Sequence, residues 1–366
     1  MPEQRPAPPP APTSPGDAVR STTGARSAPA ADAARAFAIL WIVVAVAAVA
    51  MALVLFIGWL PAWGEWWGLD GARVLAIART WLDGGDPYAT RGYLYTPLAF
   101  LLAVPWTGLP QDVALGGWFV LRVVVVAGAA IYATRGMPPV VRAIATAVAL
   151  VCVPVLAEYI VGNVTILLAA AMLPVIYGRH RLSGVPFAIA FAAAPKPLML
   201  AFLCWVLVHR RPLVVPMLAG GLAATAVATV IAGPANLVAW LGTLTRFGGG
   251  SLDFMGNTGL TASAPGWFVV VASLATAALV IFSLARADES TSLVVATVAG
   301  LILTPYSGSN LAVIVLPALS LYARSHPGHA AIVAAAIVAL PFGLPLFAAF
   351  GLVVASLPDR SARAMA

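Results

Sequence analysis

Charge is what this sequence has least of. Only 9% of its 366 residues are charged, 61% are hydrophobic, and the mean hydropathy is +0.97. Soluble domains carry about 25% charged residues, so a water-soluble fold is excluded. The net charge of +7 does not indicate nucleic-acid binding, because the basic residues stand singly or in pairs at the ends of apolar blocks, as topology signals do.

Metal and disulfide ligands are also scarce. The 2 cysteines, Cys152 and Cys204, lie inside apolar segments with no histidine or second cysteine at ligand spacing. The sequence has no Asp-x-Asp cluster of the kind that holds a divalent cation. We therefore expect no metal site and no cofactor, and we interpret both cysteines as packing residues.

Apolar blocks recur along most of the chain. Their length, about 15–25 residues, lets a helix cross about 30 Å of hydrocarbon, and they lack the alternation of a membrane barrel. The sequence thus predicts an all-α polytopic membrane protein with roughly 10–12 transmembrane helices. We expect spans near 37–60, 112–134, 142–160, 163–178, 184–196, 197–209, 212–232, 266–285, 291–306, 309–323 and 329–357, the last of which suits a hairpin as well.

The two ends of the chain flank this transmembrane domain, predicted over 34–357. Residues 1–33 are rich in Pro, Ala and Ser and cannot bury enough apolar surface to fold, so they predict a disordered cytoplasmic tail. The first apolar block is too long for the core of a signal peptide and serves as an anchor that runs from inside to outside. Residues 358–366 form a second cytoplasmic tail.

The basic residues fix the orientation. This threading places fourteen of the twenty Lys and Arg residues in the cytoplasm, as the positive-inside rule expects. The apolar run Thr96–Leu109 is the open point, because a full crossing there would move ten of the fourteen outside. We therefore predict a re-entrant or half-spanning helix over 96–109.

Two extracytoplasmic loops follow from this topology. In the first, 61–95, Val74, Ile77, Ala78 and Trp81 have the i, i+3, i+4, i+7 spacing of an amphipathic helix, which we expect at the membrane surface.

The second extracytoplasmic loop covers 233–265. It carries Arg246 and a glycine run at 248–250, which are typical of a mobile loop near a site.

Asp70 stands at the start of the amphipathic helix. A carboxylate there gains about 0.3–1 kcal/mol from the helix dipole, so a capping role is one interpretation. The other is a general base that takes the proton from an acceptor hydroxyl as it attacks the anomeric carbon of a sugar. Asp83 and Asp86 flank Gly84-Gly85, a pattern that also indicates simple turn chemistry.

Lys196 is the only lysine, and it stands between Pro195 and Pro197 where two short apolar segments meet. A cation at membrane depth costs about 2.5–3.5 kcal/mol on insertion scales and needs a partner. A lipid-linked phosphate fits, because lysine binds phosphate as a compact point charge. Snorkelling to the interface or pairing with Glu158 would also satisfy it.

Two further polar breaks fall at the same extracytoplasmic level. Glu158, Gly162 and Asn163 lie where one span ends and the next returns, which suits either a site or a tight turn. The run Thr304–Asn310 interrupts an apolar stretch, as broken helices beside a polar cavity do, although a plain hairpin explains it equally well.

Several short motifs together resemble glycosyltransferase family 87, whose members are membrane enzymes of the GT-C fold that use polyprenyl-phosphate sugars. The resemblance covers about residues 36–325. It rests on Asp70, Gly84-Gly85-Asp86-Pro87-Tyr88, Tyr95-Thr96-Pro97-Leu98, Gly162-Asn163, Lys196-Pro197 and Thr304-Pro305-Tyr306-Ser307. The chain departs from the family where many members have a histidine and it has Ser309 and Asn310, which leaves any acceptor assignment there open.

The resemblance implies roles for these residues. Asp70 corresponds to the family's proposed catalytic base and Lys196 to a lysine that meets the donor phosphate. The further substrate-binding residues that we expect are Tyr95, Asp86, Tyr88, Asn163, Glu158, Tyr306, Asn310 and Arg246. The family's usual donors carry mannose or arabinofuranose, and its usual acceptors are cell-envelope glycolipids or glycans.

The sequence thus favours an inverting glycosyltransferase in the plasma membrane, with an active site that faces the extracytoplasmic side. Its expected partners are membrane lipids, a polyprenyl-phosphate sugar donor and a glycolipid or glycan acceptor, and no metal is required. The alternative is a transporter or flippase of a lipid-linked substrate, because proline-broken short spans and a buried cation also suit alternating access. A non-catalytic membrane scaffold is a third reading.

Overall fold

The computed structural model describes residues 68–89, 93–247, 265–304 and 309–326, all within one compact unit, Val49–Ala366. Four predicted segments lie outside the described residues: the tails 1–33 and 358–366 and the spans 37–60 and 329–357. Within the described ranges the chain is helical and contains no strand. The prediction of an all-α polytopic membrane protein is confirmed.

The elements follow one another in a simple order. They are α3 (Leu69–Leu82), α4 (Pro97–Ala103), η2 (Val104–Trp106), α5 (Gln111–Ala133), α6 (Pro139–Val151), α7 (Val153–Val161), α8 (Thr165–Tyr177), η3 (Arg181–Gly184), α9 (Val185–Ala193), η4 (Pro197–Met199), α10 (Leu200–His209), α11 (Arg211–Ala232), α12 (Pro234–Phe247), α14 (Gly266–Arg286), α15 (Glu289–Leu303), η5 (Ser309–Ile314) and α16 (Val315–Ser325).

Three of these helices, α5, α11 and α14, are each long and apolar enough to cross a membrane. The predicted span 142–160 is instead two helices, α6 and α7, bent by 46° at Cys152, and together they also pass this test. Pro154 explains the break, because proline lacks the N–H that a continuous helix would need. The remaining predicted spans within the described ranges are apolar helices of 10–17 residues.

The apolar run 96–109 is one of these short helices. It is helical from Pro97 to Trp106, first as α4 and then as the 3-10 turn η2. A helix of this length rises about 15 Å, half of the roughly 30 Å of hydrocarbon. This helix is therefore too short to cross the membrane alone, and its length is that of a half-spanning helix.

The predicted amphipathic helix is α3. Its residues Ile77 and Ala78 are buried against Tyr93 and Phe100, with Val74 and Trp81 packed alongside. The spacing thus identified the apolar face correctly. That face, however, is covered by the chain itself, because α4 and the end of α11 pack on it.

The predicted mobile loop 233–265 needs a correction, because its first part forms the helix α12. Trp240 of this helix donates a hydrogen bond from Nε1 to the carbonyl of Leu94 at 2.9 Å, which ties α12 to the first loop. The proline at position 234 starts the helix, since its fixed φ suits a first helical residue. Arg246 lies in the last turn, and its side chain is outside the described part of the structure.

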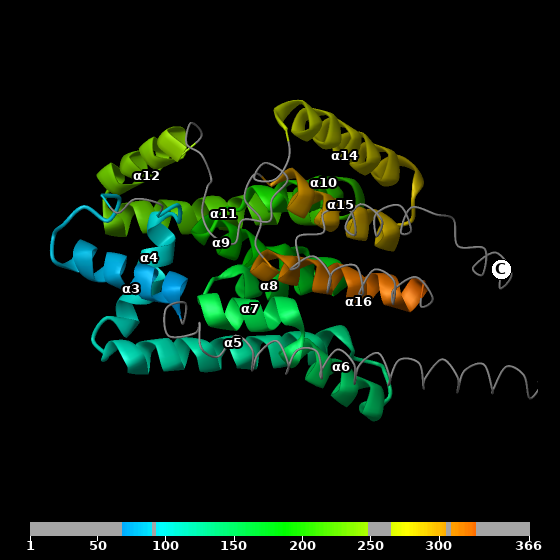
Figure 1. Ribbon diagram of the computed structural model, residues 1–366, viewed down its shortest axis with the longest axis horizontal. Helices are drawn as coiled ribbons and strands as arrows, with labels where there is room; N and C mark the ends of the chain where they lie inside the picture. Colours follow the sequence, from blue (N-terminus) through cyan, green and yellow to red (C-terminus); the bar gives the residue numbers. More distant parts are fainter. Residues whose placement is uncertain (1–67, 90–92, 248–264, 305–308, 327–366) are drawn as a thin grey trace, which may run out of the picture. The chain divides into compact units, whose positions relative to one another are not determined.

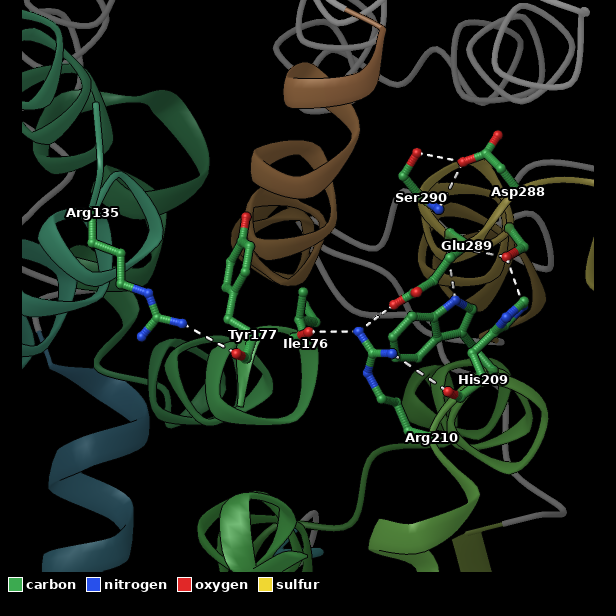
Figure 2. Close-up of polar contacts among 10 residues, drawn as sticks. Arg135, Ile176, Tyr177, His209, Arg210, Asp288, Glu289 and Ser290 are labelled. Atoms are coloured by element: carbon green, nitrogen blue, oxygen red, sulfur yellow. Dashed lines mark hydrogen bonds and ion pairs between the residues drawn. The ribbon is translucent and has the colours of Figure 1, made fainter. Parts of the chain in front are cut away.

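The helices divide into a long bundle and a group at one end of it. Helices α5, α8, α11 and α16 run lengthwise in Figure 1, and α3, α4 and α12 gather at its left. Lys196 directly precedes η4, and α10 then runs on to His209. Figure 2 shows the far end, where Arg210 lies between Glu289 and the carbonyl of Ile176.

Candidate functional site

The site begins where the end of α7 meets the start of α3. Gly162 ends α7 with a φ of +79°, in the left-handed region that favours glycine. A Cβ at this position would lie 3.0 Å from Cα of Gly68 and 3.1 Å from N of Gly71. The N–H of Gly68 donates to the carbonyl of Ile160 at 2.7 Å. Glycine on both sides therefore permits a backbone contact that a side chain would prevent.

This contact brings Asp70 to Asn163. Nδ2 of Asn163 donates to Oδ2 of Asp70 at 2.6 Å. The other end of the amide, Oδ1, accepts from the Thr165 backbone N–H at 3.2 Å and from its hydroxyl at 2.9 Å. Because a backbone N–H only donates, this pattern fixes the amide with its NH₂ group toward Asp70.

The capping interpretation of Asp70 is not the one that the geometry favours. Gly68 occupies the N-cap of α3, and no side chain caps the helix there. The carboxylate of Asp70 accepts from Asn163 instead, and its second oxygen lies 3.9 Å from Nη1 of Arg73. The Asp70 side chain is 18% exposed, so it is shielded but still accessible.

Lys196 is placed by a second close backbone contact. A Cβ on Gly300 of α15 would lie 2.1 Å from the carbonyl oxygen of Leu198, two residues after the lysine. Lys196 is half-buried as a residue, and its ammonium lies 5.8 Å from the ring centroid of Tyr95, within cation–π range. It also interacts electrostatically with Glu158 and Asp70.

Lys196 nevertheless has no direct counter-ion among the described residues, since no carboxylate oxygen there lies within 4.0 Å of its ammonium. The predicted alternative of a Lys196–Glu158 pair is therefore present as an attraction but not as a contact. Two acids draw the cation toward them, and neither neutralises it.

Glu158 is the most deeply buried of these groups, with an exposed fraction of 0%. Its Oε1 accepts from Nδ2 of Asn310 at 2.9 Å, while its Oε2 has no hydrogen-bond partner within the described ranges. A buried carboxylate with one oxygen unsatisfied is costly and indicates a role beyond packing. Asn310 thus lies on Glu158.

Of the other predicted substrate-binding residues, one lies at the site and two support the loop that carries it. Tyr95 lies beside Lys196, whereas Asp86 accepts from the backbone N–H of Tyr88 at 2.8 Å, the turn chemistry that the sequence also allowed. The Tyr88 hydroxyl donates to the Tyr95 carbonyl at 3.2 Å, so both support the loop that carries Tyr95. Tyr306 lies outside the described residues.

Sequence reasoning missed the residues that hold the site together. Arg122 of α5 is 1% exposed and donates to the carbonyls of Glu158 and Tyr159 at the end of α7. Trp118, one turn earlier, donates from Nε1 to the carbonyl of Gly162 at 2.9 Å. An arginine inside the apolar run 112–134 was the available signal for this, because such a cation needs buried partners.

The site is therefore a convergence of three parts. Asp70 and Asn163 meet at the glycine contact, and Glu158 and Asn310 lie in the core. Lys196 lies beside Tyr95 and interacts electrostatically with the carboxylates of Asp70 and Glu158. Such a set can accept a proton at Asp70 and attract an anion at Lys196.

Comparison with known proteins identifies the family. The family model described as glycosyltransferase family 87 matches residues 93–305. No match to the chain was found among curated proteins or among solved structures. The matched region contains Tyr95, Glu158, Asn163 and Lys196 and leaves out Asp70 and Asn310. It covers more than half of the chain, which therefore belongs to glycosyltransferase family 87 and is a membrane glycosyltransferase.

Proposed function

We propose that the protein transfers a sugar from a polyprenyl-phosphate donor to a hydroxyl of a cell-envelope glycolipid or glycan, with inversion at the anomeric carbon. Mannose and arabinofuranose are the sugars proposed first. The observation that carries this proposal is the combination of an accessible carboxylate, Asp70, with a cation, Lys196, whose ammonium has no carboxylate oxygen within 4.0 Å among the described residues. A sugar phosphate bound there would have its anomeric carbon between a base and an anion site.

In the proposed reaction Asp70 is the general base. The acceptor oxygen attacks the anomeric carbon, the bond from that carbon to the phosphate oxygen breaks, and the acceptor proton moves to the Asp70 carboxylate. The Asn163 amide donates to the Asp70 carboxylate and holds it in one orientation, which positions the base before the acceptor arrives.

Lys196 would stabilise the leaving group. The polyprenyl phosphate takes the electron pair of the broken bond, so negative charge grows on its oxygens during transfer. The ammonium is free to receive that charge, since no ion pair occupies it in the described part of the chain. Asp70 and Glu158 keep the cation at this place until the phosphate binds.

Tyr95 and the membrane complete the scheme. The Tyr95 ring beside Lys196 offers an apolar face to the sugar or to the first prenyl unit. The prenyl chain would leave between helices into the bilayer, and the site would face the extracytoplasmic side, as the positive-inside rule favours. Transfer without a metal follows from this scheme, because Lys196 supplies the positive charge, and unchanged rates in EDTA would support that part.

The direct test is transfer of radiolabelled sugar from a panel of polyprenyl-phosphate donors to membrane lipids. The wild type would be compared at matched expression with Asp70→Asn and with Asp83→Asn, an exposed aspartate in the same loop as a control. We expect Asp70→Asn to abolish transfer and Asp83→Asn to retain it. Equal transfer by all three proteins would remove Asp70 from the mechanism, and no transfer by the wild type would reject these donors.

A further inference from the structure

The C-terminal end of α7 receives hydrogen bonds from two other parts of the chain. A helix end leaves its last carbonyl groups without partners inside the helix, and a membrane interior offers no water to satisfy them. In α7 these carbonyls belong to the residues on either side of the site, between Glu158 and Asn163. Whatever binds them also sets where the side chains of Glu158 and Asn163 lie.

Three neighbours supply the donors. Arg122 binds the carbonyls of Glu158 and, at 3.2 Å, of Tyr159. The Gly68 N–H binds that of Ile160 at 2.7 Å. Trp118 binds that of Gly162 at 2.9 Å. The end of α7 is thus fixed from α5 on one side and from the start of α3 on the other.

Arg122 and Trp118 act from the same face of α5, since residues four apart lie one turn above each other. The Arg122 guanidinium also lies 5.8 Å from the Trp118 ring centroid and 5.9 Å from that of Tyr159. Trp118 in addition faces Gly71 of α3, where an added Cβ would lie 3.2 Å from its ring. The two side chains therefore touch both halves of the contact that joins Asp70 to Asn163.

An arginine at this depth is costly, and stability alone does not explain it. Arg122 is almost fully buried within the candidate span α5. In the described ranges it makes no ion pair, and its hydrogen-bond acceptors there are backbone carbonyls. Its charge also acts on the carboxylate of Glu158. Charged groups kept inside a membrane protein generally mark functional positions.

We propose that Arg122 and Trp118 are positioning residues for the transfer reaction. They hold the end of α7 so that Asn163 stays on Asp70 and Glu158 stays beside Lys196. The reaction itself rests on the function proposed above, but the positioning can be measured without it. A displacement of about 1 Å at reacting groups can cost about 10²-fold in rate, so a helix end that is free to move would impair transfer.

The first test measures position directly. In a chain with Cys152 and Cys204 replaced by alanine, Asp70→Cys and Asn163→Cys are joined by a short bis-methanethiosulfonate cross-linker in purified, full-length protein. We expect efficient cross-linking with Arg122 present, loss of most of it in Arg122→Met, and partial recovery in Arg122→Lys. Arg286→Met, an exposed arginine at the end of α14, is the matched control and should leave cross-linking unchanged.

The second test measures transfer in the chain with native residues 70 and 163. For Arg122→Lys and Trp118→Phe we expect kcat to fall by up to about 10²-fold while KM for the donor changes little, because the anion site at Lys196 is intact. Trp118→Phe keeps an aromatic ring at this position and removes the N–H donor. It provides a folded variant if Arg122→Met fails to fold.

The outcomes separate the two proposals. Cross-linking and kcat per folded molecule that equal the parent values in Arg122→Met, or in Trp118→Phe, would overturn the positioning role. Cross-linking that depends on Arg122 in a protein that transfers no sugar from any donor would retain the positioning role and reject the proposed function.

Discussion

The basic residues that flank the two ends of the segment Pro197–His209 differ in their ion pairing. At its start, Lys196 has no ion pair in the described ranges, and Oε2 of nearby Glu158 has no hydrogen-bond partner. After its end, Arg210 pairs with Glu289 and donates to the carbonyl of Ile176 at 2.9 Å, as Figure 2 shows, although its Nε has no hydrogen-bond partner in the described ranges. A charge that is paired within the chain maintains the fold, whereas a charge without an ion pair is available to a substrate.

Aspartate shows the same contrast. Asp288 is the N-cap of α15 and accepts from the backbone N–H groups of Ser290 at 2.9 Å and of Thr291 at 3.1 Å. Asp70 also lies in the first turn of a helix, but it accepts from the distant side chain of Asn163. Asp288 therefore caps its own helix, whereas Asp70 is held by a side chain from outside its helix. The two ends should therefore respond differently to substitution.

Replacement of Lys196 should have the largest effect. Lys196→Met removes the cation from the proposed phosphate site and should lower transfer by about 10²–10³-fold, the range for loss of one charge-stabilising donor. Lys196→Arg should retain part of the activity. The measurement is the rate of radiolabelled sugar transfer per folded molecule, with Arg210→Met as the comparison. Equal losses in Lys196→Met and Arg210→Met would contradict the division between the two ends.

Gly162→Ala should damage both position and stability. The left-handed φ and the 3.0 Å approach to Gly68 both oppose a side chain, and such backbone strain costs about 1–3 kcal/mol. We expect a lower Tm in detergent together with loss of the cross-link between positions 70 and 163. Gly136→Ala is the matched control, because Gly136 also has a positive φ but a Cβ there meets nothing within 4 Å. If both variants lose the cross-link equally, the close approach is not what positions Asp70.

The Arg210–Glu289 pair should affect stability and not chemistry. The two side chains are 28% and 38% exposed, so solvent screening limits the pair to about 1 kcal/mol or less. Glu289→Gln should lower the Tm by a few degrees. The donor KM and kcat per folded molecule should stay at the wild-type values. A change in kcat without a change in Tm would show that the two ends are coupled.

The sequence contained much of the site because polar residues stand out in apolar blocks. Glu158, Asn163 and Lys196 are predicted in this way, whereas Asp70 is predicted from its place at the start of the amphipathic helix in the polar first loop. The structure joins Asp70 to Asn163 by a hydrogen bond, and Lys196 interacts electrostatically with Asp70 and Glu158. The contact between Asn163 and Asp70 could not be predicted, since it depends on backbone approaches between segments far apart in the sequence. The approach of Gly162 to Gly68 is an example, because one glycine looks the same in any turn.

Three parts of the fold escaped prediction for related reasons. Hydrophobic periodicity identified the apolar face of α3, but it could not show that other parts of the chain, and not the membrane surface, pack against that face. The break at Cys152 was hidden because the apolar block is continuous in composition, although Pro154 signals it. Glycines at 248–250 suggested a loop, yet the residues before them form α12. Composition describes a segment, whereas packing depends on its neighbours.

Replacement of the N-cap Asp288 should affect stability alone and should give the clearest pH dependence. Burial alone would raise its pKa, but hydrogen bonds from Ser290 and Thr291 outweigh that and hold the pKa below its ordinary value. A carboxylate with a lowered folded-state pKa stabilises the fold above its unfolded pKa, near 3.9, and this contribution is lost as the pH falls through the lower, folded value. Asp288→Ala should therefore cost about 1 kcal/mol at neutral pH, the usual worth of an N-cap. The difference in Tm between wild type and variant should narrow below about pH 4. A difference in Tm that stays constant down to pH 3 would mean that the cap does not depend on ionised Asp288. It would also mean that the charges at this end of the molecule are less well paired than their contacts indicate.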